Sequence, residues 1–138
     1  MIIGYTAGVF DLFHIGHLRL LQRAKGFCDC LVVGVTTDEL AHQNSKKPII
    51  PLGERMDIIG SLRCVDVVIP QENMDKVSYC KKLNASLLFV GDDWYETKNW
   101  KKYEQECKKN GIKVIYLPYT KHVSSSVLKC KIRELDHK

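Results

Sequence analysis

Short runs of β-branched and aliphatic residues alternate with longer helical stretches along the whole chain of 138 residues. The runs predict strands at residues 2–6, 31–35, 65–69, 87–90 and 113–117. The remaining periodic stretches predict helices at residues 16–25, 54–62, 73–83, 98–110 and 124–135. Regular alternation of this kind predicts an α/β fold, a Rossmann-like parallel five-stranded sheet with helices on both faces. The length suits a single domain over residues 1–138.

Three residues are predicted to mark the boundaries of these elements. Pro70 is expected to stop the third strand, and Gly111 is expected to follow the C-terminal end of the helix at 98–110. Asn73 is a candidate N-cap for the helix that it begins.

Composition narrows the class of protein. Hydrophobic residues make up 45% and charged residues 27%, which is ordinary for a globular domain. No apolar run approaches the about 20 residues of a membrane span, and residues 1–5 do not begin a secretory signal. We therefore expect no membrane insertion and a cytoplasmic location. The net charge of +5 fits the handling of polyanionic small molecules. It would also fit weak nucleic-acid binding, but no aromatic-basic platform supports a nucleic-acid partner.

In such sheets, ligands bind beyond the carboxyl ends of the strands, near the switch in strand order. That rule selects the loops after the first, fourth and fifth predicted strands. The first of these runs from Gly8 to His17. Gly8 allows close approach of a ligand to the backbone, and Gly16 begins a helix whose N-terminal amides suit a phosphate. His14 and His17 fall on one side of the first helical turn, where two imidazoles can stabilise a developing phosphoryl charge.

Two other interpretations of the histidine pair are open. A His-x-x-His pair can bind zinc, but a zinc site needs a third or fourth ligand and none has a convincing spacing. Alternatively, the pair is structural, which would be the better interpretation if the motif stood alone.

The segment Phe10-Asp11-x-x-His14-x-Gly16-His17 resembles the HxGH signature of the cytidylyltransferase branch of the nucleotidyltransferase superfamily. The resemblance extends along the chain to Lys46-Lys47, to residues 63–70 and to residues 91–94. HxGH together with Gly-Asp-Asp-Trp at 91–94 in so short a chain is similar to the bacterial glycerol-3-phosphate cytidylyltransferases.

The resemblance implies in-line attack of an acceptor phosphate on the α-phosphorus of CTP, with no covalent enzyme intermediate. His14 and His17 would contact the triphosphate and stabilise the transition state, and Asp11 would order the loop or the metal. Mg²⁺ would be bound through the triphosphate rather than by the protein alone. The residues implied to bind the nucleotide in this loop are Gly8, Val9, Phe10, Asp11 and Gly16.

The resemblance also assigns residues in other segments. Asp93 and Trp94 would contact the nucleotide, although two acids and a tryptophan at a strand end are also compatible with a surface turn. Lys46 would reach phosphate and take part in catalysis, although a lysine on a loop is often only solvated. Arg55 and Arg63 are candidate phosphate or acceptor ligands, and Arg63 is also a candidate for a subunit interface.

The loop after the fifth predicted strand departs from the family pattern. Thr120 and Ser124 match it and Ser125 is a conservative replacement, so these hydroxyls are expected at the nucleotide. Tyr119 stands where the family has an arginine, and we hypothesise that Lys121 restores the lost charge. The change leaves the nucleotide preference and the acceptor open.

The sequence therefore predicts a nucleotidyltransferase that transfers CMP from CTP to a small phosphorylated alcohol, first of all glycerol 3-phosphate. Alternatives are another polyol phosphate, phosphocholine or phosphoethanolamine as acceptor, transfer of AMP, or a nucleotide-binding sensor without activity. The resemblance implies a homodimer and a product that serves a capsule or cell wall polymer.

Overall fold

A computed structural model describes residues 1–91, 100–118 and 123–136 of the chain. Strands and helices alternate in this part of the chain as the sequence predicts. The strands are β1 (Ile3–Gly8), β2 (Cys30–Thr36), β3 (Val67–Gln71), β4 (Leu87–Gly91) and β5 (Lys113–Leu117). The helices are α1 (Ile15–Lys25), α2 (Asp38–Gln43), α3 (Leu52–Gly60), α4 (Lys76–Leu83), α5 (Trp100–Lys109) and α6 (Ser125–Asp136).

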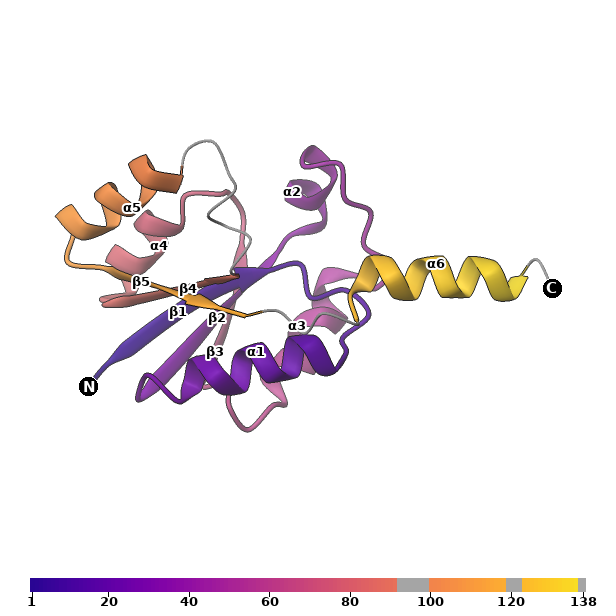
Figure 1. Ribbon diagram of the computed structural model, residues 1–138, viewed down its shortest axis with the longest axis horizontal. Helices are drawn as coiled ribbons and strands as arrows, with labels where there is room; N and C mark the ends of the chain where they lie inside the picture. The colour runs from indigo at the N-terminus through magenta and orange to yellow at the C-terminus, as the bar shows by residue number, and fades with distance from the viewer. Residues whose placement is uncertain (92–99, 119–122, 137–138) are drawn as a thin grey trace.

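All five strands are parallel, and their order in the sheet is β3-β2-β1-β4-β5. The first three strands therefore extend the sheet in one direction, and β4 and β5 extend it in the other. The order reverses between β1 and β4, which makes the carboxyl ends of these two strands the expected ligand site. The segment that carries both histidines, which continues into α1, leaves β1 at this point (Figure 1).

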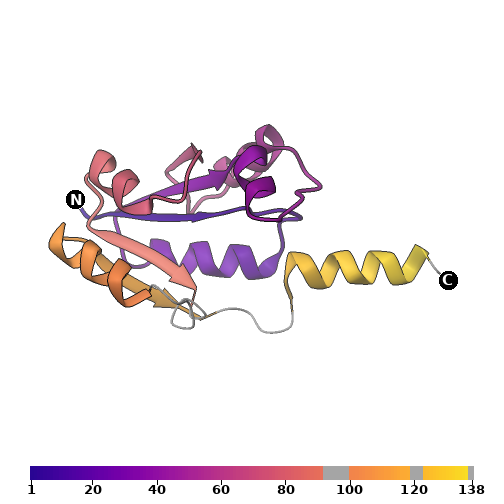
Figure 2. The same ribbon diagram turned by 90° about the horizontal axis from the view of Figure 1, so that it is seen from above.

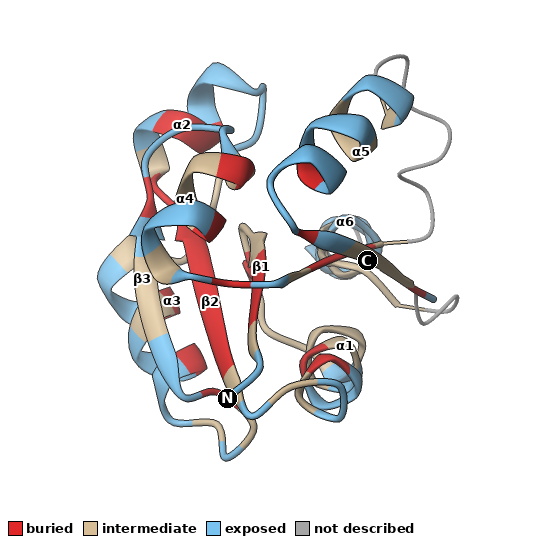
Figure 3. Ribbon diagram, turned by 90° about the vertical axis from the view of Figure 1, so that its left-hand side faces the viewer, coloured by how far each residue is buried: buried red, intermediate tan, exposed pale blue. Residues whose placement is uncertain are grey.

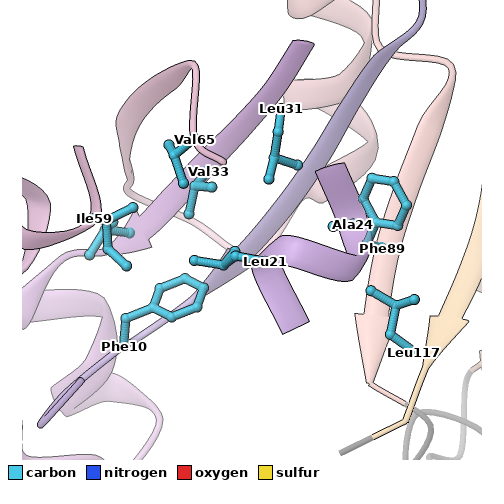
Figure 4. Packing of buried hydrophobic residues seen from close by; sticks show 10 residues of the cluster. Phe10, Leu21, Ala24, Leu31, Val33, Ile59, Val65, Phe89 and Leu117 are labelled. Carbon is cyan, nitrogen blue, oxygen red and sulfur yellow. The ribbon is translucent and has the colours of Figure 1, made fainter. Parts of the chain in front are cut away.

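Helices cover both faces of the sheet, as predicted. α1 and α3 lie on one face, and α4 and α5 lie on the other (Figures 1 and 2). The core beside α1 and α3 includes Phe10, Leu21, Ile59 and Phe89 (Figure 4). β2 is buried along almost its whole length (Figure 3), which explains its continuous apolar sequence.

Of the three predicted boundary residues, two differ from the structure and one is confirmed by it. Pro70 does not stop β3, which continues to Gln71. A proline is tolerated there because β3 is an edge strand. α4 begins at Lys76 and is capped by Asp75, whose Oδ1 accepts the N–H of Ser78, so Asn73 is not its N-cap. Gly111 follows α5 with a φ of +71°, as its predicted place after the helix requires.

Two helices have features that the sequence did not indicate. α2 is only six residues long and is capped by Thr37, whose Oγ1 accepts the N–H of Leu40. α6 extends away from the body of the domain (Figures 1 and 2), and none of its residues is fully buried. No helix in the described part of the chain is long and apolar enough to cross a membrane.

Candidate active site

The loop of residues 9–14, here called the histidine loop, leaves β1 in a conformation that costs energy. Phe10 and Leu12 have φ angles of 53° and 47°, in the left-handed region that bulky residues avoid. Each such residue costs of order 1–3 kcal/mol. Burial of the Phe10 ring in the core offsets part of this cost (Figure 4). A side chain at position 8 would lie 3.1 Å from that ring, which explains why Gly8 precedes the loop.

His14 and His17 form a reciprocal capping box at the start of α1. His14 is the N-cap, and its Nδ1 accepts the N–H of Gly16 at 3.0 Å. The Nδ1 of His17 in turn accepts the N–H of His14 at 3.2 Å. Two orphan amides of the helix start are satisfied in this way. The two rings stack with their centroids 3.8 Å apart.

The small residue between the histidines makes this arrangement possible. A Cβ at position 16 would lie 2.8 Å from Cε1 of the His14 ring, closer than real contacts allow. Any residue other than glycine would therefore push the ring of His14 out of the capping position. Gly16 thus allows the imidazole to fold back over the helix start.

The capping box fixes the protonation of both imidazoles. Each Nδ1 accepts a hydrogen bond and so carries no proton, which leaves the proton on Nε2. Burial, and then the neighbouring His14, lower the pKa of His17 to about 4 against a smaller opposing effect of Asp11. Burial also lowers the pKa of His14. Near neutral pH, both residues are therefore neutral imidazoles that can donate from Nε2.

One of these donors has no acceptor among the described residues. The Nε2 atom of His14 is buried and has no hydrogen-bond partner within the described part of the chain. An unsatisfied buried donor is costly, so its presence in a strained loop indicates that a ligand completes it. The histidine pair thus caps the helix, and it leaves the Nε2 of His14 available to a ligand.

Asp11 joins the histidine loop to two other segments. Its side chain is 3% exposed, and its Oδ2 and Oδ1 accept the N–H groups of Ile49 and Ile50 at 2.9 and 3.0 Å. The Nζ of Lys129, on α6, lies 3.0 Å from Oδ2. The backbone oxygen of Asp11 accepts a hydrogen bond from the Oγ of Ser125, at the start of the same helix.

The described part of the site holds no cluster of side chains that would bind a metal ion. Within residues 1–91, 100–118 and 123–136, no three His, Cys, Asp or Glu side chains gather to hold one. Both carboxylate oxygens of Asp11 accept backbone hydrogen bonds, so Asp11 orders the loops around it. Mg²⁺ bound through the phosphate oxygens of a triphosphate would be compatible with this lining.

Arg55 has a different place from the one expected of a phosphate ligand. Its side chain is 0% exposed, and its guanidinium is directed at the protein itself. The groups that it contacts are the backbone oxygens of Val9, Thr36 and Ile50, at 2.7, 2.8 and 2.8 Å, and the carboxylate of Asp38, at 2.5 Å. The guanidinium is therefore not directed at a phosphate, as the sequence had led us to expect. Arg55 instead positions the histidine loop through its hydrogen bond to the backbone oxygen of Val9.

Lys46 lies at the carboxyl ends of the first three strands. It is exposed and belongs to residues 44–51, here called the lysine loop, which Asp11 anchors at its far end. A hollow of about 180 Å³ lies beside it. The residues that line this hollow are Ala7, Gly8, Val9, Thr36, Ala41, Asn44, Lys46, Gln71, Met74 and Lys76. The histidine loop therefore borders a cavity with two lysines.

The remaining predicted residues are placed as follows. Ser124 directly precedes α6, where its Oγ accepts the N–H of Val127, and Ser125 contacts Asp11 as described. Arg63 is exposed and lies between α3 and β3, at the amino ends of the strands. It is therefore not brought together with His14 and His17 within this chain. Four predicted residues lie outside the described ones: Asp93, Trp94, Thr120 and Lys121.

Sequence reasoning missed Lys129 and Asp38. Lys129 stands one helical turn after Ser125, so the two share a face of α6, and this spacing was the available signal. Asp38 begins α2, a helix that was not predicted. Its contact with Arg55 had no local signal, because the two belong to different helices.

Comparisons with known proteins agree with this geometry. A sequence model of the cytidylyltransferase-like family matches residues 5–132. The chain belongs to this family. The cytidylyltransferase-like resemblance predicted from the HxGH segment is therefore confirmed.

Known cytidylyltransferase-like proteins match along nearly their whole length. Glycerol-3-phosphate cytidylyltransferase of Bacillus spizizenii is 38% identical over 125 residues, which cover 90% of this chain and 92% of that protein. The protein of the same name from Bacillus subtilis is 37% identical over 131 residues, covering 94% and 96%. The crystal structure of a lipopolysaccharide core biosynthesis protein from Thermoplasma volcanium superposes with a TM-score of 0.73 at 30% identity, covering 89% and 99%.

Proposed function

We propose that this protein transfers CMP from CTP to glycerol 3-phosphate, which gives CDP-glycerol and pyrophosphate. A phosphate oxygen of the acceptor attacks the α-phosphorus, a new P–O bond forms, and the bond to the β-phosphate breaks. The observation that carries the proposal is the pair of Nε2 donors at the switch point of the sheet. The names of the Bacillus relatives supply the substrates.

The geometry of the histidine loop supports catalysis by stabilisation of charge. Burial lowers the pKa of both His14 and His17, so near neutral pH they are neutral imidazoles that can donate hydrogen bonds from Nε2 to phosphoryl oxygens. Within the described part of the chain, the Nε2 of His14 donates to no protein group, so a substrate would not have to displace an existing acceptor. A phosphoryl oxygen that gains negative charge in the transition state would accept its hydrogen bond. Strain in the loop and the clamp by Arg55 hold these donors in place before substrate binds.

The hollow beside the histidine loop supports a site for the acceptor. It lies at the ends of β1, β2 and β3, on one side of the switch point, and Lys46 and Lys76 line it. The nucleotide would then lie toward the ends of β4 and β5, where Asp93, Trp94, Thr120 and Lys121 stand in the sequence. In this arrangement the two substrates would meet beside Gly8 and Val9, where an acceptor oxygen could approach the α-phosphorus opposite the leaving pyrophosphate, as in-line attack requires.

Further parts of the proposal concern the setting of the reaction. Mg²⁺ would accompany the triphosphate and neutralise charge on its oxygens. The enzyme would act in the cytoplasm as a homodimer, with exposed Arg63 near the interface. Its product would serve the synthesis of a capsule or cell wall polymer.

A panel of substrates tests the proposal. Pyrophosphate release is measured with CTP or ATP and with glycerol 3-phosphate, other polyol phosphates, phosphocholine or phosphoethanolamine. We expect the highest kcat/KM with CTP and glycerol 3-phosphate. Nucleotide binding without turnover of any pair would favour the sensor, and turnover with ATP alone would contradict CTP as the donor. For substitutions of His14 or His17 in the same assay, the matched control is His42→Ala, because His42 is an exposed histidine on α2 outside the capping box.

A further inference from the structure

Gln71 ends β3 with a carboxamide whose orientation is fixed. The residue is 1% exposed, and its Oε1 accepts a hydrogen bond from the hydroxyl of Tyr5 at 2.6 Å. Burial, and to a lesser degree the neighbouring Tyr79, raise the pKa of Tyr5, so its phenol keeps its proton and is the donor. The oxygen of the carboxamide therefore faces Tyr5, and the NH₂ group faces the other way.

Three neighbouring strands build this contact. Tyr5 is on β1 and Gln71 is on β3, so the hydroxyl of Tyr5 must cross β2 to reach its partner. It crosses at Gly34, where a Cβ would overlap the hydroxyl oxygen. The Tyr5 ring is also stacked on Tyr79, with centroids 5.8 Å apart and planes 10° from parallel. The phenol is thus held from two sides, and its hydroxyl donates to the carboxamide oxygen of Gln71.

The one side-chain hydrogen bond of Gln71 within residues 1–91, 100–118 and 123–136 is the bond to Oε1, so the NH₂ end is left to the hollow. Gln71 lines the hollow together with Val9 and Lys46. An amide N–H that faces such a hollow can donate to a ligand or to water there. The hollow therefore combines cationic groups, which suit a phosphate, with a fixed neutral donor, which suits an uncharged oxygen.

We propose that Gln71 determines acceptor specificity by donating from Nε2 to a hydroxyl oxygen of the phosphorylated alcohol. The proposal rests on the proposed function, because it takes the hollow as the acceptor site. A polyol phosphate offers oxygen atoms that accept from the amide. The ammonium of phosphoethanolamine offers only donors, and the trimethylammonium of phosphocholine offers neither. Tyr5 is a positioning residue in this arrangement, since it acts on the acceptor only through Gln71.

The test compares two acceptors in the full-length enzyme. Glycerol 3-phosphate has two hydroxyl groups, and 1-propyl phosphate has the same carbon chain without them. We expect the wild type to prefer glycerol 3-phosphate by on the order of 10- to 100-fold in kcat/KM. Gln71→Met, which keeps the length but removes the donors, should lose most of this preference. KM for CTP and kcat/KM for 1-propyl phosphate should change less than about twofold, which a general structural defect would not achieve.

A second variant keeps the inference falsifiable if Gln71→Met does not fold. Tyr5→Phe leaves Gln71 in place but frees its carboxamide to turn, so we expect an intermediate loss of the preference for glycerol 3-phosphate. Equal loss with both acceptors, or an unchanged preference in either folded variant, would overturn the role of Gln71. Wild-type turnover without any preference would overturn it as well. Absence of turnover with every phosphorylated alcohol would instead contradict the proposed function.

Discussion

The ammonium of Lys129 lies 3.0 Å from the buried carboxylate of Asp11 and ties α6 to the histidine loop. The same ammonium donates to the backbone oxygen of Lys47 at 3.3 Å, so one side chain contacts both site loops. α6 has no fully buried residue and depends on such polar contacts for its position. Because Ser124 and Ser125 stand at its start, the ion pair also sets the place of these hydroxyls.

Removal of this ammonium should loosen the site. In Lys129→Met, the carboxylate of Asp11 keeps its two amide donors but loses its cationic partner. We expect a loss of about 1–2 kcal/mol in the free energy of unfolding, because Lys129 is partly exposed. We also expect kcat to fall by roughly tenfold. Urea unfolding and steady-state kinetics measure the two effects.

Lys131→Met is the matched control for this change. Lys131 is an exposed lysine on the same helix. Its substitution should change stability by less than about 0.5 kcal/mol and leave kcat unaltered. An equal effect of both substitutions would mean that only the net charge of α6 matters.

Much of the sheet was predictable because its strands carry a local signal. β2 is buried on both faces, so it reads as a continuous apolar run, and the prediction for 31–35 lies within Cys30–Thr36. α2 was not predictable in the same way, since six residues are too few to establish a helical period. Pro70 was misjudged because the edge position of β3 depends on the strand order.

The candidate site was likewise predictable only where the signal lies within one segment of the sequence. His14 and His17 are three residues apart, so their shared helical turn follows from the sequence, but their capping role depends on the backbone of the loop. Arg55 was assigned to phosphate because a guanidinium suits that ligand. Its burial results from three separate backbone segments that meet around it, and no local pattern encodes such a meeting.

Stability should depend on pH through the histidines. The pKa of His17 is lowered to about 4 in the folded protein, whereas an unfolded histidine titrates near 6.5. Between these values the unfolded state binds more protons, so stability is fully present above about pH 6.5 and is lost as the pH falls toward 4. The slope per group is at most about 1.4 kcal/mol per pH unit. His14, whose pKa is also lowered, adds to the slope in the same direction.

His17→Gln isolates this contribution. A glutamine at this position can still accept from the N-cap amide, as in a usual capping box, but it does not titrate. We expect a flatter stability profile between pH 4 and 6.5 in urea unfolding at a series of pH values. An unchanged slope would show that other groups cause the pH dependence.

The Nε2 donor of His14 can be separated from its capping role. In His14→Asn, the side-chain oxygen can still accept the amide of Gly16, because asparagine is a good N-cap, but the donor to substrate is lost. We expect the melting temperature to change little and kcat to fall by roughly 100- to 1000-fold, as for the loss of one transition-state donor. His42→Ala should keep full activity. A large fall in stability with little change in kcat would show that the cap matters more than the donor.

Arg55→Lys should reduce the stability of the protein more than its affinity for substrates. A lysine has one charged group and cannot reach the backbone oxygens of Val9, Thr36 and Ile50 together, so at least one buried acceptor stays unpaired. We expect a loss of about 3 kcal/mol or more in the free energy of unfolding, together with lower kcat, since Val9 begins the histidine loop. Arg19, an exposed arginine on α1, is the control, and Arg19→Lys should cost less than about 0.5 kcal/mol. If Arg55→Lys instead kept its stability and raised only KM for a phosphate-bearing substrate, Arg55 would be a phosphate ligand.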